Sequence, residues 1–97
     1  MYGTVMTATL KGSADQLRSA AEEWAMKRPA PGFRREEILI GDDGRSVVAV
    51  VFFDSKEDYE RLADDPEQDT WWSGQMEPLL SDVTWTDGSW QEPLTPG

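Results

Sequence analysis

The chain has 97 residues and a formal net charge of −10, and it contains no Cys, His or Asn. A chain of this length makes one domain, and the missing residue types exclude disulfides, thiolate nucleophiles and imidazole ligands for haem or zinc. The acidity opposes binding to nucleic acid, and the longest apolar run, residues 47–53, is too short to span a membrane, so we expect neither partner.

The first half of the chain predicts a strand, a helix and a hairpin. Residues 4–11 alternate as a strand does, and Ser13 with Gln16 forms a capping box that opens a helix ending at the Pro-rich segment 29–32. Nothing before this strand resembles a signal peptide, so we expect a cytoplasmic protein. Residues 33–40 and 45–53 flank the turn signal Asp43-Gly44 and should pair as antiparallel strands.

The predicted hairpin is apolar on both faces. Whether its loop has two or four residues, one face carries Ile38, Ile40, Val47, Ala49, Val51 and Phe53. The opposite face carries Phe33, Arg35, Glu37, Leu39, Val48, Val50 and Phe52. Because helices can cover only one face, we expect a homodimer whose two sheets pack together; the alternative is that Trp90 and Leu94 of the tail cover the second face.

The second half of the chain predicts a broken helical region and a last strand. Asp54 or Ser55 can cap a helix with Tyr59 on its inner stripe, and Asp65-Pro66 restarts a helix. Residues 82–86 predict a short strand with Val83 and Trp85 on one side, and Asp87-Gly88 should turn the chain into a tail over 87–97. The order predicts a single α+β domain with a core over 4–86, a ferredoxin-like β-α-β-β-α-β fold with a four-stranded antiparallel sheet.

Two adjacent tryptophans stand out in the helical region. Trp72 begins a stripe with Met76, Leu79 and Leu80 that is typical of a buried helix face. Trp71 has polar neighbours at helical spacing, so three positions remain possible for it: a dimer contact, the rim of a pocket, or plain exposure to solvent. A gap walled by Trp and Met suits a flat organic ligand, although these side chains can also simply fill a small core.

Few polar side chains are candidates for chemistry. The Tyr59 hydroxyl can reach a cavity or bond to a backbone carbonyl. Arg35 and Glu37 lie two apart on one strand face, where they can bind or deprotonate a substrate or form a cross-subunit ion pair. No calcium-loop motif occurs, so we expect no metal site, although carboxylates alone could still build one.

The segment VVAVVFFDSKEDYERLADDPEQDTWWSGQMEPLLSDVTW resembles the antibiotic biosynthesis monooxygenase family of the dimeric α/β barrel superfamily. The shared pattern is a strand, a capped helix, a break, an aromatic helix and a short last strand, and it extends over nearly all of residues 4–90. The resemblance implies dimers in which two sheets form a barrel, with a cavity between sheet and helices in each subunit.

The resemblance also implies a chemistry. Several members oxidise aromatic polyketides with O₂ and no metal, flavin or haem; others degrade haem with an Asn, Trp and His set, of which two types are absent here. The anthrone-oxidising members use Asn, Trp, Tyr and Arg, which leaves as counterparts Trp71 or Trp72, Tyr59, and Arg34 or Arg35.

We therefore expect a monooxygenase or cyclase that needs no cofactor and acts on a small aromatic, polyketide-like molecule. Trp71, Trp72 and Met76 would bind the substrate, Tyr59 would hydrogen-bond it, and Arg34 or Arg35 would stabilise its anion. The alternatives are a non-catalytic protein that binds an apolar small molecule and a dimeric scaffold domain.

Overall fold

The computed structural model describes residues 1–27 and 30–97, without the side chain of Lys27. The elements in chain order are β1 (Tyr2–Leu10), α1 (Ala14–Lys27), β2 (Phe33–Ile40), β3 (Ser46–Phe53), α2 (Lys56–Ala63), α3 (Pro66–Trp71), a π-helix (Trp72–Met76), a 3₁₀ helix (Glu77–Leu79) and β4 (Leu80–Ser89). Among the described residues, no helix has the length and apolar character that crossing a membrane requires.

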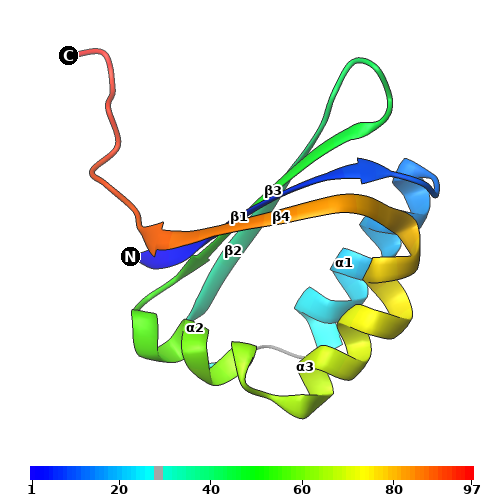
Figure 1. The fold of residues 1–97 in the computed structure, drawn as a ribbon. Coiled ribbons are helices and arrows are strands. Elements are labelled where there is room, and N and C mark those ends of the chain that lie inside the picture. Colours follow the sequence, from blue (N-terminus) through cyan, green and yellow to red (C-terminus); the bar gives the residue numbers. More distant parts are fainter. Residues whose placement is uncertain (28–29) are drawn as a thin grey trace.

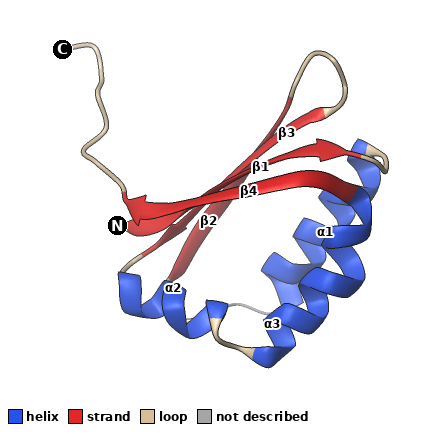
Figure 2. Ribbon diagram, viewed as in Figure 1, coloured by secondary structure: helices blue, strands red, loops and turns tan. Residues whose placement is uncertain are grey.

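The four strands form one antiparallel sheet in the order β2-β3-β1-β4. The helices lie against one face of this sheet and leave the other face uncovered (Figures 1 and 2). This arrangement confirms the predicted α+β, ferredoxin-like fold. We call the covered side the inner face and the uncovered side the outer face.

The hydrophobic core lies between the inner face and the helices. Met6, Val47 and Phe53 from the sheet and Leu17 from α1 are its most deeply buried large side chains. Ile38 and Ile40 pack against the same core, which confirms the predicted division of β2 and β3 into two faces.

Phe33 is the exception to that division. The register of β2 against β3 shifts between Phe33 and Arg35, so that Phe33 pairs with Phe53 and Arg35 with Phe52. This bulge turns Phe33 to the inner face, where its ring centroid lies 4.9 Å from that of Trp24 and 5.8 Å from that of Phe53. The expectation that Phe33 faces outward was wrong, because one extra residue reverses the alternation.

The β2–β3 hairpin turns at the predicted Asp43-Gly44 signal, but its loop spans residues 41–45, longer than either predicted loop. Asp43 Oδ1 accepts hydrogen bonds from the backbone N–H groups of Arg45 and Ser46, both at 2.9 Å. Gly44 has φ of +72°, a conformation that favours glycine.

The last strand differs most from the prediction. β4 runs to Ser89, so Asp87 and Gly88 do not turn the chain but pair with Thr4 and Gly3 of β1. The Trp90 backbone N–H then donates to the Met1 carbonyl at 2.9 Å, and the remaining tail leaves the sheet (Figure 1). Continued pairing with β1 outweighs the local turn signal here.

The outer face is covered only in part. The Trp90 ring stacks on Phe52 with centroids 4.4 Å apart, and its Nε1–H donates to the Val51 carbonyl at 3.2 Å. Leu94, by contrast, is 99% exposed, and Leu39 is 63% exposed. The tail therefore shields this face through Trp90 but not through Leu94, and Val48 and Val50 remain half-buried.

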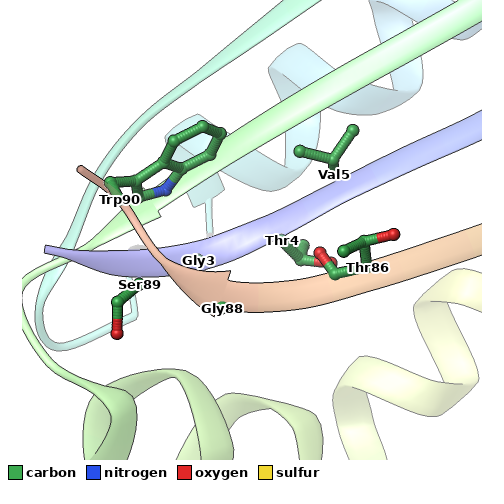
Figure 3. Close-up of a pocket in the computed structure, with 7 residues that line it drawn as sticks. All are labelled: Gly3, Thr4, Val5, Thr86, Gly88, Ser89 and Trp90. Atoms are coloured by element: carbon green, nitrogen blue, oxygen red, sulfur yellow. The ribbon is translucent and has the colours of Figure 1, made fainter. Parts of the chain in front are cut away.

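A small hollow lies beside Trp90 at the end of the sheet where β1 and β4 pair (Figure 3). Gly3 and Gly88 face each other across these strands and contribute no side chains, while Val5 stands on the same side as the indole. The hollow has a volume of about 150 Å³. A Cβ atom on Gly3 would lie only 2.6 Å from Trp90 Nε1, so this glycine lets the indole approach the sheet.

Candidate functional site

A cavity of about 80 Å³ lies between the inner face and the helices. Every strand and every helical element from α1 to the π-helix contributes to its wall. The lining residues are Met6, Trp24, Glu36, Ala49, Val51, Phe53, Tyr59, Leu62, Gln68, Trp71, Trp72, Met76 and Trp85.

Four indoles form a continuous aromatic wall around this cavity. The ring centroid of Trp71 lies 5.9 Å from that of Trp24 and 6.4 Å from that of Trp72, and Trp72 lies 5.0 Å from Trp85. Trp85 comes from the edge strand β4 and is 49% exposed, so this part of the wall meets solvent.

Trp71 and Trp72 both border the cavity although they are adjacent in sequence. Trp71 ends α3 and Trp72 begins the π-helix, in which each turn is wider than in an α-helix. Both indoles line the cavity, with their ring planes inclined at 57° to each other. Of the three positions left open for Trp71, the structure shows the cavity wall.

The polar atoms of two indoles differ in their partners. Trp24 Nε1–H donates to Gln68 Oε1 at 2.7 Å, which fixes both side chains in the wall. Trp71 Nε1 is buried and finds no acceptor among the described residues. A buried N–H without an acceptor is costly, and a ligand carbonyl would satisfy it.

Glu36 is the only carboxyl group in the described lining of the cavity. It lies on β2 opposite Val51 and two residues before Ile38, so strand alternation places its side chain on the inner face. Burial disfavours the charged form and raises the pKa of Glu36 to about 7. No three acidic side chains gather around a common point in the described part of the chain, as metal ligands would.

Tyr59 has its ring at the cavity and its hydroxyl at β4. The ring packs against Phe53 with centroids 5.6 Å apart, and the hydroxyl donates to Asp87 Oδ1 at 2.9 Å. Burial, with the neighbouring Asp87 carboxylate, raises the pKa of Tyr59 to about 12, so the phenol stays protonated near neutrality. This bond is to a side-chain carboxylate rather than to a backbone carbonyl.

The structure brings together four of the residues expected in the site: Tyr59, Trp71, Trp72 and Met76. Trp72 faces the core as predicted.

The charged candidates lie elsewhere. Arg35 and Glu37 are on the outer face, where Arg35 Nε lies 3.1 Å from Glu37 Oε2 and the guanidinium lies 4.0 Å from the Phe52 ring centroid. Arg34 pairs with Asp54 at 2.5 Å on the surface. The cavity is therefore built without the three charged residues that the sequence favoured, because strand alternation and the bulge direct them away.

The sequence reasoning missed Glu36, Trp24, Gln68 and Trp85 as lining residues. A signal for Glu36 was present, because it lies two residues before Ile38 and so on the apolar side of the strand. An acid within an apolar stripe indicates a buried carboxyl or a functional site.

No protein-family model and no curated protein matches this sequence. Solved structures do match. SnoaB, a cofactor-independent oxygenase from Streptomyces nogalater, aligns over 98% of this chain and 97% of its own with a TM-score of 0.80 and 18% identity.

Two further structures align over most of their length. The monooxygenase from the gene ActVA-Orf6 of Streptomyces coelicolor, solved with the ligand nanaomycin D, covers 99% of this chain and 92% of its own, with a TM-score of 0.67 and 20% identity. The haem degrader MhuD from Mycobacterium tuberculosis covers 95% and 99%, with a TM-score of 0.59 and 14% identity.

The chain has the antibiotic biosynthesis monooxygenase fold. The resemblance seen in the sequence is thus confirmed for the architecture. Identities of 14–20% carry the fold alone, so the activity must be argued from the cavity.

Proposed function

We propose that this chain is a monooxygenase that needs no cofactor and acts on a small, flat aromatic molecule bound in the cavity. The observation that carries the proposal is the wall of four indoles with Met76 between the sheet and the helices, within a fold shared with oxygenases. Indole faces stack on aromatic rings, and a ligand held between the sheet and the helices would be shielded from water by these elements.

The reaction proposed is the oxidation of an electron-rich aromatic methylene or phenol by O₂. Once such a molecule is deprotonated, its anion can pass an electron to O₂ and combine with the resulting superoxide. Conversion of a CH₂ group and O₂ into a C=O group and water balances in atoms and electrons without an external reductant. The protein then needs only to bind the substrate, favour its anion and keep the site dry.

The size of the cavity sets a condition on binding. Its 80 Å³ is smaller than the roughly 150 Å³ that accommodates benzene in a protein interior, so a polycyclic substrate must displace part of the wall. Trp85 is the half-exposed part of that wall, and we propose that it moves outward with Trp72 to admit the ligand.

We also propose that the protein is a cytoplasmic homodimer whose outer faces pack together. Val48, Val50 and Phe52 are half-buried in the single chain, and a second sheet would cover them. Arg35 and Glu37 then lie at the interface between subunits rather than in the site.

Oxygen consumption tests the enzymatic proposal. Purified, metal-free protein is mixed with a panel of naphthols, anthrones and hydroxylated naphthalenones, and O₂ uptake is followed together with quinone absorbance. We expect uptake with at least one compound, loss of uptake in Trp72→Ala, and retention in Trp90→Leu, which alters only the outer face.

An absence of uptake across the panel would count against an oxygenase. Saturable quenching of tryptophan fluorescence by the same compounds, without uptake, would instead identify a binding protein for aromatic molecules. The indole wall predicts such quenching in either case.

A further inference from the structure

The cavity holds two titratable side chains among its described lining residues, Glu36 and Tyr59. All other lining side chains are apolar, indole or amide. The Tyr59 hydroxyl already donates a hydrogen bond to Asp87 and stays protonated over the physiological range, because its pKa is raised to about 12. Any proton that moves within this cavity near neutrality must therefore involve Glu36 or the ligand.

The surroundings of Glu36 leave its carboxylate available. No hydrogen bond or ion pair to this carboxyl occurs among the described residues, and its cross-strand neighbour is the apolar Val51. Glu37, one residue away, is paired with Arg35 and faces outward. A partly buried carboxylate without a donor, next to apolar and aromatic side chains, accepts protons more readily than one in water.

We propose that Glu36 is the catalytic base of this site and that its substrates are flat aromatic ketones or phenols carrying an acidic C–H or O–H group. This inference rests on the proposed oxygenase function and names the group that starts it. A Glu36 carboxylate oxygen takes the proton, and the electrons of the broken C–H bond remain on the substrate as an enolate.

The rest of the cycle balances within the same site. O₂ oxidises the enolate and adds to the carbon as a peroxide anion, which takes the first proton back from Glu36 and becomes a hydroperoxide. The Glu36 carboxylate then removes the remaining proton from that carbon as the carbonyl forms and the O–O bond breaks. It passes this proton to the departing hydroxide, which leaves as water, and the carboxylate is restored. Near neutrality the base is substantially ionised, since its pKa is about 7.

The test follows proton abstraction without oxygenation. The protein is incubated anaerobically in D₂O with 2-indanone or anthrone, whose methylene protons are acidified by a ketone and an aromatic ring, and deuterium incorporation is measured by NMR. We expect the wild type to exchange these protons faster than buffer. Glu36→Gln should lower the protein-dependent rate by about 10²- to 10⁴-fold, as loss of a general base does.

Glu37→Gln is the matched control, because it removes a carboxyl from the same strand on the outer face. It should exchange as fast as the wild type. Glu36→Asp keeps a carboxylate at the same position and should recover part of the rate. In the wild type, the exchange rate should rise with pH and level off above about pH 7. This pH-dependent rise should be absent in Glu36→Gln.

The outcomes separate the two proposals. In one outcome, anthrone binds to Glu36→Gln, as seen by quenching of its tryptophan fluorescence, and the anthrone protons still exchange at the wild-type rate. Glu36 is then not the base, whether or not O₂ is consumed. If the wild type shows no exchange above buffer, the inference is also overturned. If proton exchange depends on Glu36 but no substrate gives O₂ uptake, Glu36 is a base and the proposed oxygenase function is wrong.

Discussion

The inner and outer faces of the sheet have similar residues but different surroundings. On β2, Glu36 faces a cavity walled by indoles, whereas Glu37 on the next position faces outward with Arg35 at 3.1 Å. Tryptophans differ in the same way: Trp72 borders the cavity, while Trp90 lies flat on Phe52 over the outer face. Whether a side chain borders the cavity or lies on the surface therefore depends on its position in the pleated sheet rather than on its residue type.

The largest expected difference between the faces is in packing. Phe53 on the inner face is 1% exposed, and Phe53→Ala should lower the free energy of unfolding by about 3–5 kcal/mol. Phe52→Ala should cost less than about 2 kcal/mol, because Phe52 is only half-buried in the single chain. Urea denaturation measures both, and equal losses would show that the outer face is as well buried as the inner one.

The pH dependence of stability sharpens the comparison of the two glutamates. The pKa of Glu36 rises on folding from 4.5 to about 7, so the folded protein keeps a proton that the unfolded chain releases between these values. Stability should therefore fall as pH rises from about 4.5 to 7 and then level off, with a total loss of up to about 3 kcal/mol.

Glu36→Gln should remove this loss and be more stable than the wild type at about pH 8, with the difference disappearing at about pH 4.5. Chemical denaturation at several pH values measures it. Glu37→Gln serves as the control, and the same pH profile in both variants would contradict a buried carboxyl at Glu36.

The two glycines beside Trp90 provide a smaller test on the outer face. A Cβ on Gly3 would lie 1.8 Å from the Val51 carbonyl oxygen, whereas nothing lies within 4 Å of the corresponding position on Gly88. Gly3→Ala should cost about 1–3 kcal/mol or more by overpacking. Gly88→Ala, at the paired position of β4, should be close to neutral, and equal thermal shifts for the two would exclude the close approach.

The smallest effect concerns the polar contact of the outer-face indole. Trp90→Phe keeps a ring to stack on Phe52 but loses the N–H that donates to the Val51 carbonyl at 3.2 Å. The expected loss is about 0.5–1.5 kcal/mol in denaturant titrations. Trp90→Leu also loses the stacking and should cost more; identical losses would assign no role to the hydrogen bond.

The sequence predicted the element order, the hairpin and the division of its faces because these follow from local patterns. Alternation predicts that Ile38 and Ile40 share one face of the hairpin with Val47 and Ala49, as they do. The order of strands and helices predicts the fold. The capping box at Ser13 and Gln16 is likewise present, with reciprocal bonds of 2.8 and 3.1 Å.

The remaining features depend on contacts between distant segments. The bulge that reverses Phe33 reflects its packing on Trp24, and the extension of β4 past Gly88 reflects pairing with β1. The cavity itself is the space left between rigid indoles from α1, α3, the π-helix and β4, which no local pattern specifies. Alternation alone predicts that Glu36 shares the inner face with Ile38, whereas Arg35 and Glu37, which the sequence favoured, pair on the outer face.

The charged run Arg34-Arg35-Glu36-Glu37 also has a consequence for how β2 finds its alignment during folding. In the native alignment Glu36 alone of these four residues lines the apolar cavity, and a proton can neutralise its carboxylate. A slip of β2 by one residue would instead turn Arg35 and Glu37 inward, with a guanidinium that cannot lose its charge. Misaligned pairing of the hairpin would therefore bury a charge and be disfavoured. The four residues that include the proposed base thus also stabilise the alignment that positions it.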